Sequence, residues 1–137
     1  MGKEKRIVES EIRVRYAETD AMGIVYHTNY IIWFEVGRGD YFRTVNNESF
    51  AEWEARGINF PLSEVYARYH APARYGDLVR VRTWVEEVRS RGMTFGYEIV
   101  DAAGKTLVTG YTVHLCVNHE GRVCRLPPDL ATAMGGA

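Results

Sequence analysis

The segment that follows Asn29 most constrains the fold of this 137-residue chain. Its apolar residues fall on nearly every side of a 3.6-residue helical wheel. They are Tyr30, Ile31, Ile32, Trp33, Phe34, Val36, Tyr41, Phe42 and Val45. Asn29 is a favourable N-cap for such a helix. Because a helix that is apolar all round has to be surrounded by protein, the sequence predicts a long central helix enclosed by the rest of the fold.

Alternation of apolar and polar residues predicts strands around this helix. Residues 12–16 alternate before it and indicate a first strand. After the helix, residues 79–86, 93–99 and 107–117 alternate in the same way and are separated by turn sequences. These three segments are typical of an antiparallel meander.

Shorter signals complete the expected order of elements. Residues 49–52 have the spacing of a capping box ahead of a short helix. Pro61 and Pro72 bracket an edge or connecting strand. Residues 123–126 are expected to form a last strand, and the end of the chain after Pro127 is expected to be frayed.

Composition excludes several classes of protein. The net charge of -1 argues against a nucleic-acid-binding surface, and no apolar run approaches the length of a membrane span. No apolar signal region follows the charged first residues, so the cytoplasm is the expected location. Cys116 and Cys124 lie outside zinc or redox-motif spacing and are expected to be reduced thiols. The spacing of His70, His114 and His119 predicts no metal site.

The helix and strands together predict an α+β fold in one domain, residues 1–137. A twisted antiparallel sheet of about five strands has to curl around the helix. Such a sheet covers only part of the helix and leaves open edges, so the chain is expected to form at least a dimer.

The most specific pattern lies between the first strand and the helix. It consists of Tyr16, Thr19, Asp20, Gly23, Val25, Tyr26, His27, Asn29 and Tyr30, followed by Trp33, Phe34, Glu35 and Arg38. This pattern resembles the loop and central helix of hot-dog-fold acyl-CoA thioesterases of the 4-hydroxybenzoyl-CoA thioesterase type. Within that type it looks most like the short-chain acyl-CoA thioesterases associated with the Tol-Pal cell-envelope system. The strands between residues 78 and 117 also fit, so the resemblance covers most of the chain.

The resemblance implies a hot-dog fold and an active site at a dimer interface, in a homodimer or homotetramer. It also implies that the residue matching Asp20 is the catalytic carboxylate. The backbone N–H at His27 would polarise the thioester carbonyl, and Tyr16 and the side chain of His27 would be further polar positions of the active site. The substrate would be an acyl-CoA thioester, with no metal and no cofactor.

The residues themselves allow this chemistry. An aspartate such as Asp20 is ionised at neutral pH, so it can attack the thioester carbonyl or deprotonate a water molecule. The amino end of the helix offers unpaired N–H groups that can stabilise an oxyanion. The sequence does not separate the nucleophilic route from the general-base route.

Two groups of residues are expected to contact the substrate without taking part in the chemistry. Gly23 and Tyr26 belong to the Asp20 loop. Arg89, Ser90 and Arg91 form a basic turn that can meet the nucleotide phosphates of coenzyme A.

Two other functions remain open from the sequence. A hot-dog dehydratase acting on a hydroxyacyl thioester would use His27 as base and Glu35 from the facing helix as acid. A non-catalytic acyl-CoA-binding module would keep Asp20 for a structural purpose.

Overall fold

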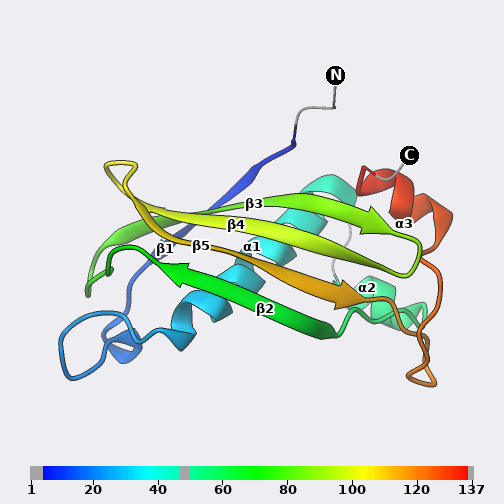
Figure 1. Cartoon of the computed structure of the whole chain (residues 1–137), viewed down its shortest axis with the longest axis horizontal. Coiled ribbons are helices and arrows are strands. Elements are labelled where there is room, and N and C mark those ends of the chain that lie inside the picture. The colour runs from blue at the N-terminus through cyan, green and yellow to red at the C-terminus, as the bar shows by residue number, and fades with distance from the viewer. Residues whose placement is uncertain (1–4, 47–49, 136–137) are drawn as a thin grey trace.

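The computed structural model describes residues 5–46 and 50–135, which form one antiparallel sheet with a long helix packed on it (Figure 1). The strand order is β1-β3-β4-β5-β2. The strands are β1 (Val8–Arg13), β2 (Leu62–Tyr69), β3 (Leu78–Arg89), β4 (Gly92–Asp101) and β5 (Thr106–Leu115). The helices are α1 (Thr28–Asn46), α2 (Phe50–Ala55) and α3 (Pro128–Ala133), with a 3-10 turn η1 at Tyr16–Glu18. The predicted α+β class and the predicted meander are confirmed.

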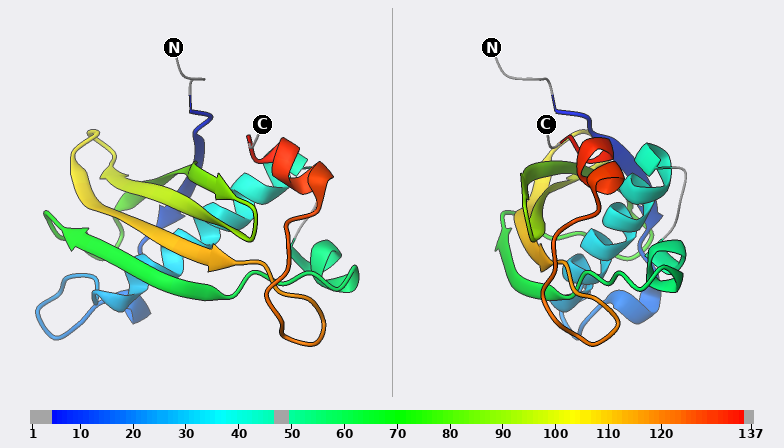
Figure 2. Two further views of the ribbon diagram at one scale, coloured as in Figure 1. Left: turned by 45° about the vertical axis from the view of Figure 1, so that its right-hand side comes forward. Right: turned by 90° about the vertical axis from the view of Figure 1, so that its right-hand side faces the viewer.

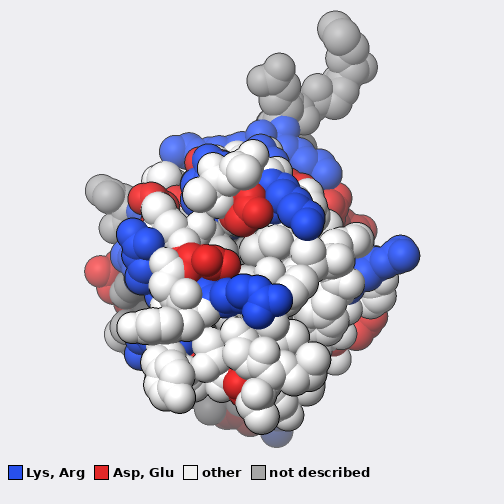
Figure 3. All heavy atoms as spheres, turned by 90° about the vertical axis from the view of Figure 1, so that its left-hand side faces the viewer, with Lys and Arg blue, Asp and Glu red and all other residues white. Residues whose placement is uncertain are grey.

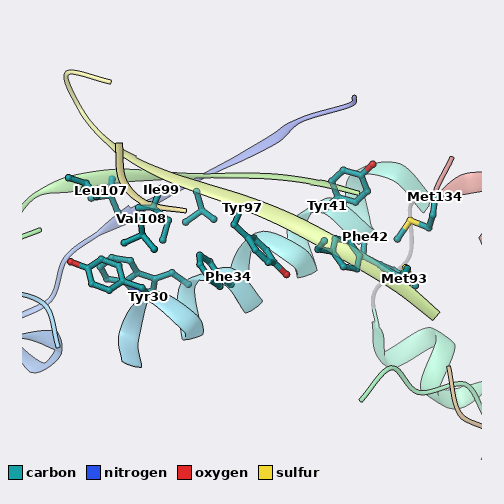
Figure 4. Packing of buried hydrophobic residues seen from close by; sticks show 14 of the residues in the cluster. Tyr30, Phe34, Tyr41, Phe42, Met93, Tyr97, Ile99, Leu107, Val108 and Met134 are labelled. Carbon is teal, nitrogen blue, oxygen red and sulfur yellow. The ribbon is translucent and has the colours of Figure 1, made fainter. Parts of the chain in front are cut away.

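The sheet curves around one side of α1, which is clearest when the molecule is viewed from its end (Figure 2). Phe34 and Phe42 of α1 are completely buried, and Phe34 stacks on Tyr97 of β4 with ring centroids 4.3 Å apart (Figure 4). Each such side chain stabilises the fold by about 1.5–3 kcal/mol through burial. The hydrophobic core therefore lies between α1 and the concave face of the sheet.

Two glycines let α1 lie close to the sheet. A Cβ at Gly37 of α1 would collide with the side chains of Thr83 and Val81 on β3. A Cβ at Gly110 of β5 would collide with the Tyr66 carbonyl and the Phe34 ring. Both positions therefore require glycine for packing reasons and fix the distance between helix and sheet.

The sheet of one chain leaves part of α1 uncovered. The side chains of Ile32 and Val36 are 53% and 41% exposed, and Glu35 beside them is also exposed. The sheet of one chain covers only one side of the helix, which agrees with the prediction that a single sheet covers it only in part. Strand β2 at the edge of the sheet is exposed along most of its length.

Two predictions near the start of the chain were displaced by a few residues. Strand β1 ends at Arg13, and Tyr16 belongs to η1 because the chain turns there toward the helix. The predicted N-cap Asn29 lies inside the first turn of α1, and its side-chain N–H donates to the backbone oxygen of Glu18 at 2.9 Å. Asn29 thus ties the preceding loop to the helix and does not cap it.

The C-terminal predictions were also partly wrong. Residues 123–126 form only an isolated bridge, between Val117 and Val123. The region after Pro127 is a short helix, α3, which buries Leu130 and Met134 in the core. The capping box predicted at residues 49–52 depends on Ser49, which lies outside the described residues.

Candidate active site

Glu18 forms hydrogen bonds that join the two ends of the loop between η1 and α1. Its backbone oxygen accepts hydrogen bonds from the Tyr26 N–H at 2.8 Å and from the Asn29 side chain at 2.9 Å. Its carboxylate accepts the Trp33 indole N–H and the Arg15 backbone N–H, each at 2.8 Å, although the residue is only 5% exposed. Burial favours the neutral acid, but these hydrogen bonds outweigh it and lower the pKa of Glu18. The loop is therefore held at both ends by one ionised side chain.

Asp20 begins a tight turn within this loop. Its Oδ1 accepts the Met22 N–H at 2.8 Å and the Ile24 N–H at 3.4 Å, and Gly23 completes the turn with a φ of 78°. Positive φ is a conformation that glycine adopts at little cost. In the part of the chain that the structure describes, Oδ2 accepts no hydrogen bond. One carboxylate oxygen is thus anchored and the other has no partner among the described residues. Asp20 itself does not line the neighbouring cavity, which is lined instead by Ile24 at the end of the turn.

A cavity of about 300 Å³ adjoins this turn and the amino end of α1. It is lined by Ile24, Val25, His27, Tyr30, Tyr69, His70, Ala71 and Pro72. The Tyr30 hydroxyl accepts the Ala73 N–H at 3.0 Å, and burial followed by nearby charges, including the Asp20 carboxylate, raises its pKa. Tyr30 thus joins the cavity wall to the loop before β3 through the Ala73 N–H.

His27 immediately precedes α1, so its backbone lies at the positive end of the helix dipole. Its carbonyl accepts the Tyr69 hydroxyl at 3.1 Å. Among the described residues, the His27 N–H donates to no backbone carbonyl. The ring of His27 is exposed and lies 4.4 Å from the Tyr26 ring. The backbone and side chain of His27 are both available to a molecule in the cavity.

The remaining predicted site residues on the loop point elsewhere. Tyr16 is 76% exposed and packs edge-on against Tyr75 at 5.8 Å, and it does not line the cavity. Tyr26 is about half exposed beside His27, and Gly23 shapes the Asp20 turn. The end of the molecule that carries this loop presents mostly uncharged atoms in its lower half (Figure 3).

The basic turn is far from Asp20 within one chain. Strand β3 has 12 residues, so at about 3.3 Å per residue its two ends lie roughly 35 Å apart. Its first residues adjoin the Asp20 side, where the backbone carbonyl of Asp77, just before β3, accepts the Val14 N–H. The turn of Arg89, Ser90 and Arg91 lies at the other end, where Arg89 pairs with Glu87 at 3.0 Å. One chain does not bring this turn to the cavity.

Glu35 is also separate from His27. It lines another cavity, of about 200 Å³, together with Arg38 and Glu54. The pair of residues that a dehydratase would need therefore does not meet in one chain. Among the described residues, no group of three or more histidine, cysteine, aspartate or glutamate side chains is placed to hold a metal ion.

Three residues that shape the site were not among the predicted site residues: Glu18, Tyr30 and Tyr69. Glu18 stands inside the motif, but its partner Trp33 lies 15 positions away and is reached only through the fold. Tyr69 is 42 positions from His27. Local spacing gives no signal for contacts of this kind.

A curved antiparallel sheet against a long helix, with a carboxylate loop at the amino end of that helix, defines a hot-dog-fold protein. A family model for the thioesterase-like superfamily matches residues 14–134, and the chain belongs to this superfamily. The predicted resemblance is confirmed at the level of the family. No described helix has the length and apolar character required to cross a bilayer.

Individual relatives agree with this assignment. The chain is 37% identical over 114 residues to the putative acyl-CoA thioesterase YneP of Bacillus subtilis, covering 83% of this chain and 82% of the relative. It is 30% identical over 107 residues to the acyl-CoA thioester hydrolase YbgC of Escherichia coli, covering 78% and 79%. The crystal structure of DHNA-CoA thioesterase from Staphylococcus aureus superposes with a TM-score of 0.88 at 37% identity, covering 93% of this chain and 87% of that one.

Proposed function

We propose that this protein is an acyl-CoA thioesterase, which hydrolyses acyl-CoA to a free acid and coenzyme A, and that Asp20 is its catalytic carboxylate. Membership of the superfamily and the similarity to YneP and YbgC support the reaction. One observation supports the assignment of Asp20 above the others. Its Oδ1 is fixed by the Met22 N–H while Oδ2 has no partner among the described residues, and the turn ends at Ile24, which lines the cavity at the start of α1.

The amino end of α1 is the proposed oxyanion site. As the thioester carbonyl carbon becomes tetrahedral, its oxygen gains negative charge that has to be stabilised. The His27 N–H is unengaged by backbone carbonyls of the described chain and lies at the positive end of the helix dipole. The His27 carbonyl, in turn, is held by Tyr69, which fixes the orientation of this peptide.

Asp20 acts by one of two routes. As a nucleophile it forms an acyl-aspartate anhydride, releases the thiolate of coenzyme A and is regenerated by water. As a general base it removes a proton from the attacking water. Rapid quenching of a single turnover with acyl-labelled substrate separates the routes, because only the nucleophilic route leaves a covalent label on the peptide that contains Asp20.

The other predicted site residues take supporting roles in this proposal. His27 lines the cavity and the Tyr26 ring packs beside the His27 ring, so both are assigned to orienting the substrate. Gly23 permits the turn that presents Asp20. Tyr16 is exposed in the single chain, so in this proposal it contacts substrate only where a second subunit packs against it and completes the site. Neither a metal nor a cofactor is needed, since Asp20 and the helix end supply both parts of the chemistry. The cytoplasm stays the predicted location.

A homodimer, or a homotetramer built from such dimers, is the proposed assembly. Strand β2 is an edge strand with exposed apolar side chains at Leu62, Val65, Tyr66 and Tyr69. Unpaired edges of this kind favour pairing with another strand. Two β2 strands paired antiparallel would place the Leu62 end of one chain beside the Tyr69 end of the other.

This pairing also accounts for the basic turn. The turn that includes Ser90 and Arg91 lies at the Leu62 end of the sheet, because Gly92 pairs with Leu115 and Leu62 pairs with His114. In the proposed dimer, this end of one subunit approaches the Asp20 cavity of its partner. Arg89, Ser90 and Arg91 would then meet the nucleotide phosphates of a substrate whose acyl group lies in the other subunit.

The test is to incubate the purified protein with aromatic and aliphatic acyl-CoAs, to measure the release of free thiol and to identify the acyl products. We expect free acid and coenzyme A in equal amounts. The Asp20→Asn variant is expected to bind acyl-CoA and to release thiol at least about 100-fold more slowly. An intact thioester with a dehydrated acyl chain, or binding without turnover in the wild type, would refute the proposal in favour of a dehydratase or a binding module.

A further inference from the structure

The two cysteines of the chain, which the proposed chemistry does not use, are in contact with each other. Cys116 follows β5, and Cys124 lies on the segment that returns beside it. Their sulfur atoms are 3.6 Å apart. The Cys124 N–H donates to the Cys116 carbonyl at 2.8 Å, next to the antiparallel bridge between Val117 and Val123. The two residues therefore face each other across a small hairpin.

This placement suits a disulfide bond. Directly opposite residues in an antiparallel pair have Cα atoms about 4.5–5.5 Å apart, the value depending on the hydrogen bonds between them. Disulfides form at Cα separations of about 4.4–6.8 Å, with an S–S distance of about 2.05 Å. Because the sulfur atoms already touch, closure requires only a small movement of the side chains and leaves the hairpin backbone in place.

The two thiols differ in their access to a reagent. Cys116 is completely buried, its S–H is directed to the Arg125 carbonyl at 3.9 Å, and burial raises the pKa of its thiol to about 12. Cys124 is only partly buried. The thiolate is the reactive form and needs access to the reagent. Cys124 is therefore the thiol that reacts first with a molecule from solution, and Cys116 reacts second.

We propose that Cys116 and Cys124 form an oxidisable dithiol site, which small-molecule disulfides convert to an intrachain disulfide. The Cys124 thiolate attacks the disulfide RSSR, forms the mixed disulfide Cys124–S–S–R and releases one RS⁻, which takes up the proton that Cys124 lost. The Cys116 sulfur then attacks Sγ of Cys124 and displaces the second RS⁻, which takes up the proton of Cys116. The protein loses two hydrogens and RSSR becomes two RSH.

The disulfide would join the two flanks of the hairpin that packs against the basic turn at residues 89–91. The Cys116 N–H donates to the Arg91 carbonyl at 2.9 Å, and the Leu126 N–H donates to the Ser90 carbonyl at 2.8 Å. Both flanks of the hairpin therefore support this turn. Oxidation joins the two flanks covalently and fixes the backbone to which Ser90 and Arg91 are bonded. The oxidation site rests on the geometry of the two thiols and not on the proposed function.

The experiment treats the reduced full-length protein with oxidised glutathione under native conditions and analyses it by mass spectrometry without reduction. We expect loss of two hydrogens from the intact mass and loss of both titratable thiols. Trypsin cuts after Lys105, Arg122 and Arg125, so the bond should link peptide 106–122 to peptide 123–125. The closed form should exceed the mixed disulfide by about tenfold or more, because the second thiol attacks within the same molecule.

Two variants make the order of attack testable. Cys116→Ala should stop at a stable glutathione adduct on Cys124, and Cys124→Ser should leave Cys116 unmodified until the protein is unfolded in urea. A glutathione adduct that persists on Cys124 of the wild-type protein would overturn the proposal. Failure of both native thiols to react, while both react after unfolding, would overturn it as well.

Discussion

Two turns of the chain, residues 20–24 and 101–105, have the same backbone geometry in different surroundings. In each, the aspartate Oδ1 accepts the N–H groups two and four residues later, at 2.8 and 3.4 Å after Asp20 and at 2.9 Å in both cases after Asp101. In each, a glycine follows three positions on with positive φ, 78° at Gly23 and 87° at Gly104. The local sequence thus determines the turn in both places.

A third turn has the same form with an amide in place of the carboxylate. Oδ1 of Asn118 accepts the N–H groups of Glu120 and Arg122 at 3.0 and 3.1 Å, and Gly121 has a φ of 78°. The turn itself therefore needs a side-chain oxygen and no negative charge. Any requirement for charge at residue 20 has to come from function.

The surroundings distinguish the Asp20 turn from the Asp101 turn. Asp20 lies by the amino end of α1 and a cavity lined by aromatic rings. Asp101 lines a cavity of about 250 Å³ whose other residues are Asp77, Leu78, Ala102 and Ala103, with no aromatic ring and no helix end. The comparison teaches that the turn presents a carboxylate, whereas the fold decides what the carboxylate meets.

The largest expected effect is a difference in kcat between the variants Asp20→Asn and Asp101→Asn. Both variants should fold, because Asn118 shows that an amide oxygen accepts the same hydrogen bonds. The kcat of Asp20→Asn should fall at least about 100-fold, while that of Asp101→Asn should stay within about twofold. Steady-state kinetics and thermal melting measure both effects. Similar kcat values for the two variants would show that the Asp20 charge has no special role.

The next prediction compares Glu18, which anchors the Asp20 loop, with Glu98, which forms an ion pair elsewhere on the sheet. Glu18→Gln should reduce stability by about 1.5–3 kcal/mol, because Glu18 accepts hydrogen bonds as a buried anion. The same change should lower kcat, because it loosens the loop that carries Asp20. Glu98→Gln, which weakens the contacts with Arg82 and Thr106 on another part of the sheet, should reduce stability without changing kcat. Urea unfolding and kinetics on the same samples provide the measurement.

The stabilisation by Glu18 should depend on pH in a defined direction. Its folded pKa is below the ordinary value of 4.5, so the stabilisation is complete above that value and is lost as the pH falls through the lower folded pKa. The difference in unfolding free energy between the wild type and Glu18→Gln should therefore be constant near neutrality and shrink in acid. A difference that grew in acid would contradict the assignment of Glu18 as an ionised anchor.

A smaller effect tests the two glycines of the paired turns. No heavy atom lies within 4 Å of a Cβ at Gly23 or Gly104, so alanine meets only the cost of positive φ, about 1 kcal/mol at each site. Both variants should lose similar stability in thermal melts. Only Gly23→Ala is expected to lower kcat, because only its turn presents the candidate catalytic group. Equal kinetic losses would mean that the effect comes from stability alone.

The smallest effect is expected for Asn118→Asp. The carboxylate accepts the same two N–H groups, and the residue lies on an exposed turn, so stability should change by no more than about 0.5 kcal/mol. Denaturant titration is sufficient to check it. A larger loss would mean that charge does matter to this type of turn, and Asp20→Asn would then need a structural explanation.

Elements with strong periodicity were predictable from the sequence, and elements defined by tertiary contacts were not. The alternation at residues 79–86 and 93–99 identified β3 and β4 together with their buried faces. The alternation at residues 107–117 located β5 but gave the wrong face, because the sheet buries Val108, Thr112 and His114 and leaves Leu115 exposed. Helix α3 was missed because Pro127 and Pro128 suggested an irregular end, although proline is common in the first turn of a helix. Its stability comes from Leu130 and Met134 in the core.

The candidate site was predictable to the extent that it lies in one continuous segment. Asp20 and His27 were identified because they lie in one loop before the helix. Tyr69 and the Ala73 N–H that holds Tyr30 reach the cavity from more than 35 residues away in sequence, as their separations of 42 and 43 positions show. The position of Arg91 relative to the cavity depends on sheet length and subunit pairing, which no local pattern encodes.

The close contact of α1 with the sheet limits how this cavity can vary. At Gly37 and Gly110 the helix and the strands are already in contact, so α1 has no space to move closer to the sheet. The burial of aromatic side chains between α1 and the sheet opposes movement of the helix away from it. The Tyr30 wall of the cavity is therefore rigid, whereas the opposite wall, from Tyr69 to Pro72, belongs to the end of an edge strand and the loop after it. Changes in substrate preference should accumulate on that outer wall, where a different side chain alters the cavity without disturbing the core.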